Sequence, residues 1–185
     1  MFVLVENNSI TKSLNISRGV TIGENQYPRA IYSSWSTAER EAIGVYEVIF
    51  DNSNRKDGEY YINTGQSFNF ADEKVTASFG SATAKSLDDV TVDGKVTEGL
   101  KSKKKRFIKN EANNLLTGTD WYVIKATEVE SYSVPEETTT YRAAVRTASN
   151  DMETLIDACT TVDELAALYT YTDGSRPLGE FPEAV

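Results

Sequence analysis

The chain has 185 residues, of which 39% are hydrophobic and 25% are charged, and its formal net charge is −9 at pH 7. That composition is enough for one buried core or two small ones, and it excludes a fibrous or wholly disordered chain. The acidic excess disfavours general binding to nucleic acid, because phosphate binding needs a cationic surface. No apolar run approaches the ~20 residues that cross a bilayer, so we expect no membrane association and synthesis in the cytoplasm.

Cysteine and histidine usage removes most enzyme classes. The chain has no histidine and a single cysteine, Cys159, which excludes Ser-His and Cys-His nucleophiles, His-ligated metals and an internal disulfide. Cys159 shares a predicted helix face with Met152 and Ile156, so we expect a small buried side chain rather than a reactive thiol. Asp88–Asp89 and Asp93 are the carboxylates closest to a catalytic pair or calcium site, but they read as surface turns. We therefore predict no catalytic residue, no cofactor and no metal.

The first eighty residues read as short strands. An opening hairpin is expected from residues 2–6 and 10–16 around an Asn7–Asn8 turn. Ser36 and Glu39 form a capping box that starts a short helix ending near Gly44. Residues 26–32 read as an extended loop, and further strands are expected over residues 45–50, 60–62, 67–70 and 74–79. Aromatic residues on these strands are expected to fill the core rather than to bind a ligand.

Several of these residues follow one another in a recognisable order. They are Tyr27–Pro28, Trp35, the run Ile43–Tyr46 and Tyr60–Tyr61. This order resembles the opening module of phage tail proteins from aquatic hosts, in which a short helix and an Ile-Gly-Val-Tyr strand precede a Tyr-rich strand. The resemblance implies a tail protein.

Residues 81–96 are rich in Ser, Thr, Ala, Asp and Gly, with an Asp93–Gly94 turn, and we predict a linker there. A helix is expected from Thr97 to Leu116, with Leu100, Phe107, Ile108, Ala112 and Leu115 on its buried side. The opposite side carries Lys101, Lys103, Lys104, Lys105, Arg106 and Lys109. We interpret this basic run as a solvated helix face, with docking onto an acidic partner as the alternative.

The segment from Leu115 to Arg146 is the most informative part of the sequence. Gly118 suits a left-handed helix end, and Trp121–Ile124 reads as an extended, partly buried run. Pro135 is expected to occupy the first position of a new helix, which Ser133 caps. Its apolar face would comprise Tyr141, Ala144, Val145 and Ala148.

Several residues of this segment stand in an order that resembles that of a known protein family. Leu115–Leu116, Thr119–Asp120–Trp121, Pro135, Tyr141–Arg142 and Arg146 stand in the sequence in that order. The order resembles the tail fibre assembly chaperone-like module found at the C-termini of many tailed-phage proteins. The resemblance covers residues 106–148, and it implies a tail or tail-fibre-associated role.

Two more short helices are expected after Arg146. Asn150 is predicted to cap the first, over residues 152–159, and a capping box at Thr161–Glu164 starts the second, which reaches Tyr169. The two are expected to form a hairpin. The last residues, 173–185, read as an extended arm anchored by Leu178 and Phe181.

The sequence as a whole predicts an α+β protein, a small mostly antiparallel β-module followed by a helical module. Its expected parts are a β-rich module (1–80), a linker (81–96), a helical chaperone-like module (97–172) and a C-terminal arm (173–185). By resemblance we expect a non-enzymatic component of the phage tail, located in the virion, which binds other tail or tail-fibre proteins. The sequence leaves open whether the chain also forms a homo-oligomer. The candidate contact residues are Trp121, Tyr122, Tyr141, Arg142, Arg146, Leu155, Leu165 and Tyr169.

Two alternatives remain at this stage. The chain could be a tail fibre assembly chaperone that is absent from the mature particle, its helices covering apolar fibre surface during assembly. It could also be a glycan-cleaving enzyme, although no credible carboxylate pair is present.

Overall fold

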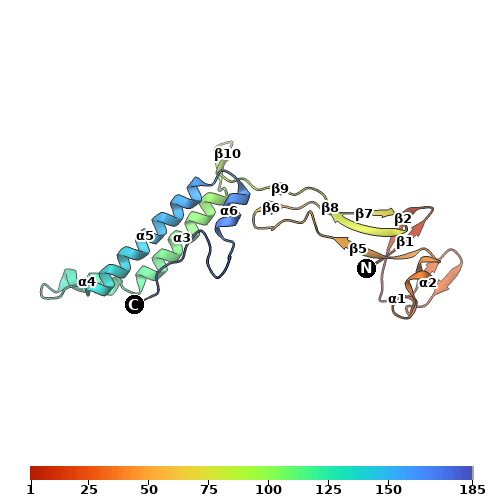
Figure 1. Ribbon diagram of the computed structural model, residues 1–185, viewed down its shortest axis with the longest axis horizontal. Helices are drawn as coiled ribbons and strands as arrows, with labels where there is room; N and C mark the ends of the chain where they lie inside the picture. Colours follow the sequence, from red (N-terminus) through yellow and green to blue (C-terminus); the bar gives the residue numbers. More distant parts are fainter. Residues whose placement is uncertain (185) are drawn as a thin grey trace. The chain divides into compact units, whose positions relative to one another are not determined.

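The computed structural model of the protein describes residues 1–184. The chain divides between Thr83 and Ala84 into two compact units (Figure 1). Most strands lie in the first unit and the long helices lie in the second, so the predicted α+β class is confirmed.

The first unit is built from short strands and two short helices. Its strands are β1 (Phe2–Glu6), β2 (Ser9–Leu14), β3 (Val20–Ile22), β4 (Asn25–Tyr27), β5 (Val45–Asp51), β6 (Tyr61–Ile62), β7 (Gln66–Ala71) and β8 (Lys74–Phe79), and its helices are α1 (Ile31–Ser34) and α2 (Thr37–Glu41). The short strand β9 (Thr83–Ala84) spans the boundary between the two units. The predicted capping box starts α2: the backbone N–H of Ser36 donates to the Glu39 carboxylate at 2.7 Å, and the Glu39 N–H donates back to the Ser36 hydroxyl.

Five strands form the main sheet, in the order β2-β1-β5-β8-β7. β1 is antiparallel to both β2 and β5, and β7 is antiparallel to β8. β5 and β8 run parallel, so the sheet is mixed rather than antiparallel throughout. The tight turns Asn7–Asn8 and Asp72–Glu73 have positive φ at both residues, which matches the twist of two-residue hairpins.

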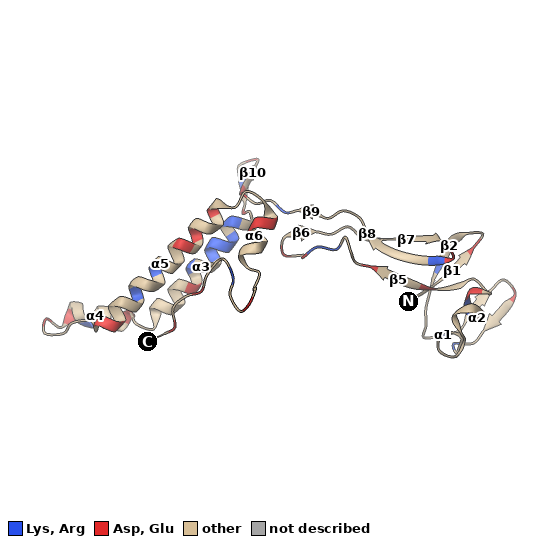
Figure 2. Ribbon diagram, viewed as in Figure 1, with Lys and Arg blue, Asp and Glu red and all other residues tan. Residues whose placement is uncertain are grey.

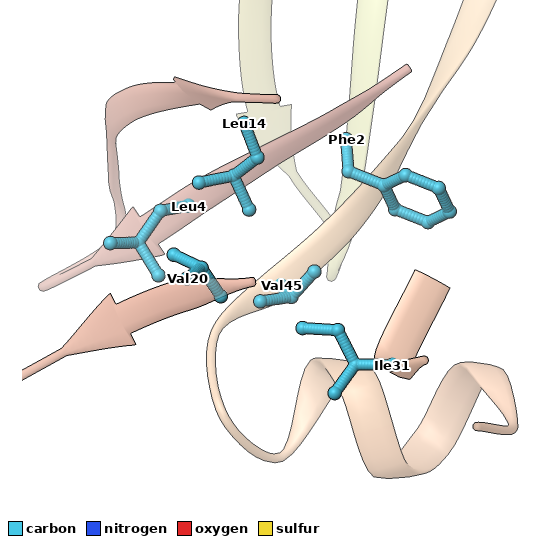
Figure 3. Close-up of a cluster of buried hydrophobic side chains, with 6 residues drawn as sticks. All are labelled: Phe2, Leu4, Leu14, Val20, Ile31 and Val45. Atoms are coloured by element: carbon cyan, nitrogen blue, oxygen red, sulfur yellow. The ribbon is translucent and has the colours of Figure 1, made fainter. Parts of the chain in front are cut away.

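The core covers both faces of β1. Phe2 and Leu4 point to one face, where they meet Leu14, Val20, Ile31 and Val45 (Figure 3). Val3 and Val5 point to the other face and pack with Val48, Val75 and Ala77. β1 therefore buries both faces, because it lies between two strands of the sheet and is covered on both sides.

Two smaller predictions for the first unit also need correction. Residues 26–32 are not a continuous loop, because Tyr27 ends β4 and Ile31 begins α1. Ile31 is fully buried among the side chains of the sheet, and that contact outweighs the loop character of Tyr27–Pro28. The second strand ends at Leu14, two residues before the predicted Ile16, which is half-exposed.

The second unit is a helical bundle preceded by a small hairpin. Its elements are β10 (Val90–Val92), β11 (Lys95–Thr97), α3 (Leu100–Thr117), α4 (Asp120–Glu128), α5 (Glu136–Ala158) and α6 (Val162–Leu168). Asp93 and Gly94 make the predicted turn of the hairpin, both with positive φ. α3 and α5 lie side by side, and α6 packs on α5 (Figure 1). The capping box of Thr161 and Glu164 starts α6 as predicted.

The buried residues of α3 and α5 explain their packing. Ile108 and Ala112 are buried on α3, while Tyr141, Val145 and Ile156 are buried on α5. Phe107 is 60% exposed, so its predicted place on the buried face is wrong: it precedes Ile108 by one residue, which turns it away by about 100°. Leu178 is buried as well, and its N–H donates to the Leu168 carbonyl, which holds the C-terminal segment against α6.

The predicted extended run at Trp121–Ile124 is wrong, because these residues lie inside α4. Gly118 has φ −61°, so α3 does not end in a left-handed residue and the chain turns directly into α4. Ser133 does not cap α5, and Pro135 stands just before the first helical residue rather than at it. The high strand propensity of Trp, Tyr, Val and Ile is therefore overridden by the contacts of the α3–α4 turn.

The predicted helix start at Asn150 is also wrong, since α5 is continuous from Glu136 to Ala158. The buried positions Tyr141, Val145, Ser149 and Met152 keep the helical period across Asn150, which is exposed. A side chain able to cap a helix does not start one where the apolar stripe continues uninterrupted. The helical hairpin expected at the C-terminus is accordingly the end of α5 followed by α6.

Gly44 provides a test of the packing of the α2–β5 turn against β1. Its φ is +79°, and a Cβ added there would lie 2.6 Å from the Val5 carbonyl oxygen. We predict that Gly44→Ala lowers the free energy of unfolding of this unit by about 2–3 kcal/mol in chemical denaturation. Gly23 is the matched control, because it also has positive φ (+58°) but no atom lies within 4 Å of an added Cβ. Equal costs for Gly23→Ala and Gly44→Ala would contradict the proposed close approach.

Candidate interaction surface

The turn that joins α3 to α4 is fixed by one side chain of α5. The Arg142 guanidinium donates to the Leu116 carbonyl at 2.9 Å and to the Thr119 hydroxyl at 2.6 Å. It also pairs with the Asp120 carboxylate at 2.8 Å. Arg142 and Thr119 are both buried. The guanidinium of one residue thus binds polar groups at the end of α3 and at the start of α4. We call this arrangement the Arg142 clamp.

A small apolar cluster lies beside the Arg142 clamp. Tyr141, Val145 and Ala112 are its buried members, with Leu115, Leu116 and Phe181 packed against them. Six of the residues that carry the phage-module resemblance therefore meet in space, because they belong to the Arg142 clamp or to this cluster: Leu115, Leu116, Thr119, Asp120, Tyr141 and Arg142. Trp121, Pro135 and Arg146 belong to neither. Their order and spacing have a structural explanation, because they connect three helices.

The Arg142 clamp presents α4 with its apolar side chains in solvent. None of the nine residues of α4 is buried. Trp121 is 51% exposed, Ile124 is 56% exposed and Val123 is 41% exposed. Tyr122 and Ala126, four residues apart, form the partly buried side of the helix. We call Trp121, Val123 and Ile124 the α4 apolar surface.

The aromatic residues of α4 are ordered by contacts within the same segment. The rings of Trp121 and Tyr122 lie 4.0 Å apart at 33°. The Lys125 ammonium lies 5.5 Å from the Trp121 ring and 4.2 Å from the Tyr132 ring, a cation–π arrangement. These contacts hold Trp121 in position while leaving half of it exposed.

The structure separates the predicted contact residues into two groups. Tyr141, Arg142 and Leu165 are buried, so they support the fold. Trp121, Tyr122, Arg146, Leu155 and Tyr169 keep exposed area and remain available for a contact. Sequence reasoning missed Val123 and Ile124 as surface residues, because it assigned them to a strand. Two signals could have identified them. Thr119–Asp120 is a residue pair typical of a helix start, and Trp121 and Ile124, which follow it, are three residues apart, as on one face of a helix.

The basic run on α3 is paired within the chain. Lys105 bonds Asp157 at 2.7 Å and Lys109 bonds Glu153 at 3.1 Å, which joins α3 to α5. Lys101 pairs with Asp88, and Arg106 pairs with Glu98. The Asp157 hydrogen bond raises the pKa of Lys105. Figure 2 shows basic stretches of α3 alongside α5, which carries acidic stretches. Most of the run therefore serves intramolecular pairing.

The acidic residues of the 81–96 segment have structural roles. Asp89 accepts a hydrogen bond from the Gly99 N–H at 2.8 Å at the start of α3, and this bond lowers the pKa of Asp89.

Cys159 is buried, which raises the pKa of its thiol and disfavours the reactive thiolate. Within residues 1–184 no group of three or more acidic or cysteine residues is placed to hold a metal ion.

No protein-family model, curated protein or solved structure matches the chain. Across the helices that the structure describes, none combines the length and apolar character needed to cross a membrane.

Replacing Arg142 tests whether the Arg142 clamp organises the second unit. Arg142→Met should lower the free energy of unfolding by about 2–4 kcal/mol, because it removes the donor to the buried Thr119 hydroxyl and to the Leu116 carbonyl and the ion pair with Asp120. Arg146→Met is the matched control: Arg146 lies one helical turn along and is exposed, and among the described residues its guanidinium donates only to the Arg142 carbonyl, at 3.3 Å. Urea denaturation of the two variants gives the comparison. Similar small losses in both would show that the Arg142 clamp contributes little.

Proposed function

We propose that the chain is a non-enzymatic structural component of a bacteriophage tail, associated with the tail fibre or connecting tail parts, and that it acts by binding other tail proteins. The observation that supports protein binding is the α4 apolar surface, an ordered helix with Trp121 and Ile124 more than half exposed. The phage assignment is supported by the resemblance of residues 106–148, whose residues form the contacts of the Arg142 clamp.

The α4 apolar surface has the chemistry of a protein contact. Tryptophan is enriched among the residues that dominate binding energy at interfaces, where a flat apolar ring enters a desolvated pocket. Trp121 is already fixed by Tyr122 and Lys125, so little side-chain freedom is lost when a partner covers it. A partner would gain its stabilisation mainly from this anchor and from Ile124.

A tail fibre assembly chaperone is the second candidate, and the same surface supports it. A short helix without a buried residue can cover apolar fibre surface and leave again, because the unit does not need α4 for its own core. Quantitative mass spectrometry of gradient-purified particles separates the two functions. A fixed ratio to the tail tube protein supports the structural role, whereas absence from particles with abundance in infected lysate supports the chaperone.

Polar substitution of the α4 apolar surface tests its role in binding. We predict that Trp121→Ser with Ile124→Ser reduces the capture of tail proteins from infected lysate at least tenfold, while the free energy of unfolding changes by less than about 1 kcal/mol. Mass spectrometry identifies the captured proteins and compares their amounts with those captured by the wild-type chain.

Phe107→Ser is the matched control, because Phe107 is 60% exposed on α3 and lies outside the α4 apolar surface. It should leave capture of the tail proteins unchanged. Equal capture by wild type and by the Trp121/Ile124 variant would remove α4 from the interface. Capture of no tail protein by wild type would contradict the proposed function itself.

A further inference from the structure

The hairpin of β10 and β11 forms a sheet of two strands by itself at the end of the bundle where α3 begins (Figure 1). Every residue from Asp88 to Thr97 is exposed. A two-stranded hairpin is marginal in water unless something else supports it. Its order therefore needs a source outside the two strands.

The first turn of α3 holds the hairpin at its base. The Gly99 N–H donates to the Asp89 carboxylate, and the Leu100 N–H donates to the Ser86 carbonyl at 3.0 Å. N–H groups at a helix start have no acceptor within the helix, so these bonds serve both elements. A Cβ added at Gly99 would lie 2.4 Å from the Asp88 carbonyl, which shows how closely the two segments approach. The hairpin is thus ordered from its base, and its strands stay in solvent.

The outer edge of β10 carries unpaired backbone groups. In a hairpin with a two-residue turn, the residues that flank the turn exchange the closely spaced pair of hydrogen bonds, and here these residues are Val92 and Lys95. The N–H and C=O of Thr91, one residue along β10, are therefore directed away from β11. Within residues 1–184 no third strand pairs with this side of β10. We call Val90–Val92, with these outward backbone groups, the β10 edge.

The β10 edge lacks the features that keep other strands away. Soluble proteins protect an edge strand with a lysine, a proline, a bulge or a covering segment. β11 carries Lys95, whereas β10 consists of Val90, Thr91 and Val92, and its pairing with β11 contains no bulge. Val90 and Val92 lie on one face of the strand, and both are exposed. A strand added to β10 would gain backbone bonds and cover these two side chains.

The charges at the two ends of β10 select the strand that fits. Asp89 precedes the strand and Asp93 follows it. If β10 of a second copy paired with β10 about Thr91, Asp89 of each copy would stand opposite Asp93 of the other, and like charges in that position are destabilising. A strand from another protein, with a lysine or arginine at each end of an apolar centre, would instead place opposite charges together.

We propose that the β10 edge binds an extended strand of a partner protein, with apolar residues against Val90 and Val92 and a lysine or arginine at each end. The proposal rests on the proposed protein-binding function and adds a second contact to it. β10 lies at the start of α3 and the α4 apolar surface follows its end, and the 18 residues of α3 span about 27 Å. Two contacts so placed suit a chain that connects separate parts of an assembly.

Binding of a synthetic peptide to the full chain tests the β10 edge without identifying the partner. The probe has a valine–threonine–valine centre with lysines at both ends, and its affinity is measured by fluorescence anisotropy. The same peptide methylated at the backbone nitrogen of its central threonine loses one donor and keeps every side chain. We expect methylation to weaken binding at least tenfold, and glutamates in place of the lysines to do the same. Equal binding of the methylated peptide, or no binding of the probe, would overturn the proposal.

Two proline variants locate the peptide on the hairpin. Thr91→Pro removes the outward N–H of β10 without removing a bond between β10 and β11, so it should weaken peptide binding at least tenfold. Val96→Pro is the matched control, because Val96 stands opposite Thr91 and its N–H points outward from β11 in the same way. It should bind within twofold of wild type. Equal affinities of the two variants would overturn the assignment to β10.

The proposed function fails independently of the β10 edge. Capture of tail proteins from lysate by wild type, together with equal peptide binding by the Thr91→Pro and Val96→Pro variants, would leave the tail role standing and refute the β10 edge. Peptide binding that Thr91→Pro alone weakens, without capture of any tail protein, would do the opposite.

Discussion

The interaction on which the helical unit depends is the bonding of one buried guanidinium to three groups. Arg142 joins the Leu116 carbonyl, the Thr119 hydroxyl and the Asp120 carboxylate, and so sets the direction in which the chain leaves α3 and enters α4. An isolated helix of nine residues is marginal in water, and α4 buries no side chain of its own. Its order therefore comes from the Arg142 clamp, and its exposed face is left for a partner.

Charge is distributed unevenly over the helical unit, and the distribution has a consequence for function. Lys105 and Lys109 pair with acidic residues of α5, so the conspicuous basic run of the sequence stabilises the bundle rather than a contact with another molecule.

Local signals predicted much of the fold. The capping boxes at Ser36 and Thr161 and the turn at Asn7–Asn8 involve neighbouring residues only, so their geometry is readable from the sequence. The prediction failed at Trp121–Ile124, where strand propensity competed with a long-range bond from Arg142. Of the predicted contact residues, burial separates Trp121 from Tyr141, Arg142 and Leu165, which sequence spacing alone does not.

The central claim is that α4 is ordered before any partner binds, with its apolar side chains in solvent. Amide hydrogen exchange of the isolated protein, read by mass spectrometry over peptides that cover residues 117–131, tests this claim directly. We predict that the amides of Ile124–Glu128 exchange at least tenfold more slowly than an unstructured chain, since they are bonded within α4. Exchange at the unstructured rate in α4, with α3 and α5 still protected, would show that the surface does not exist until a partner creates it.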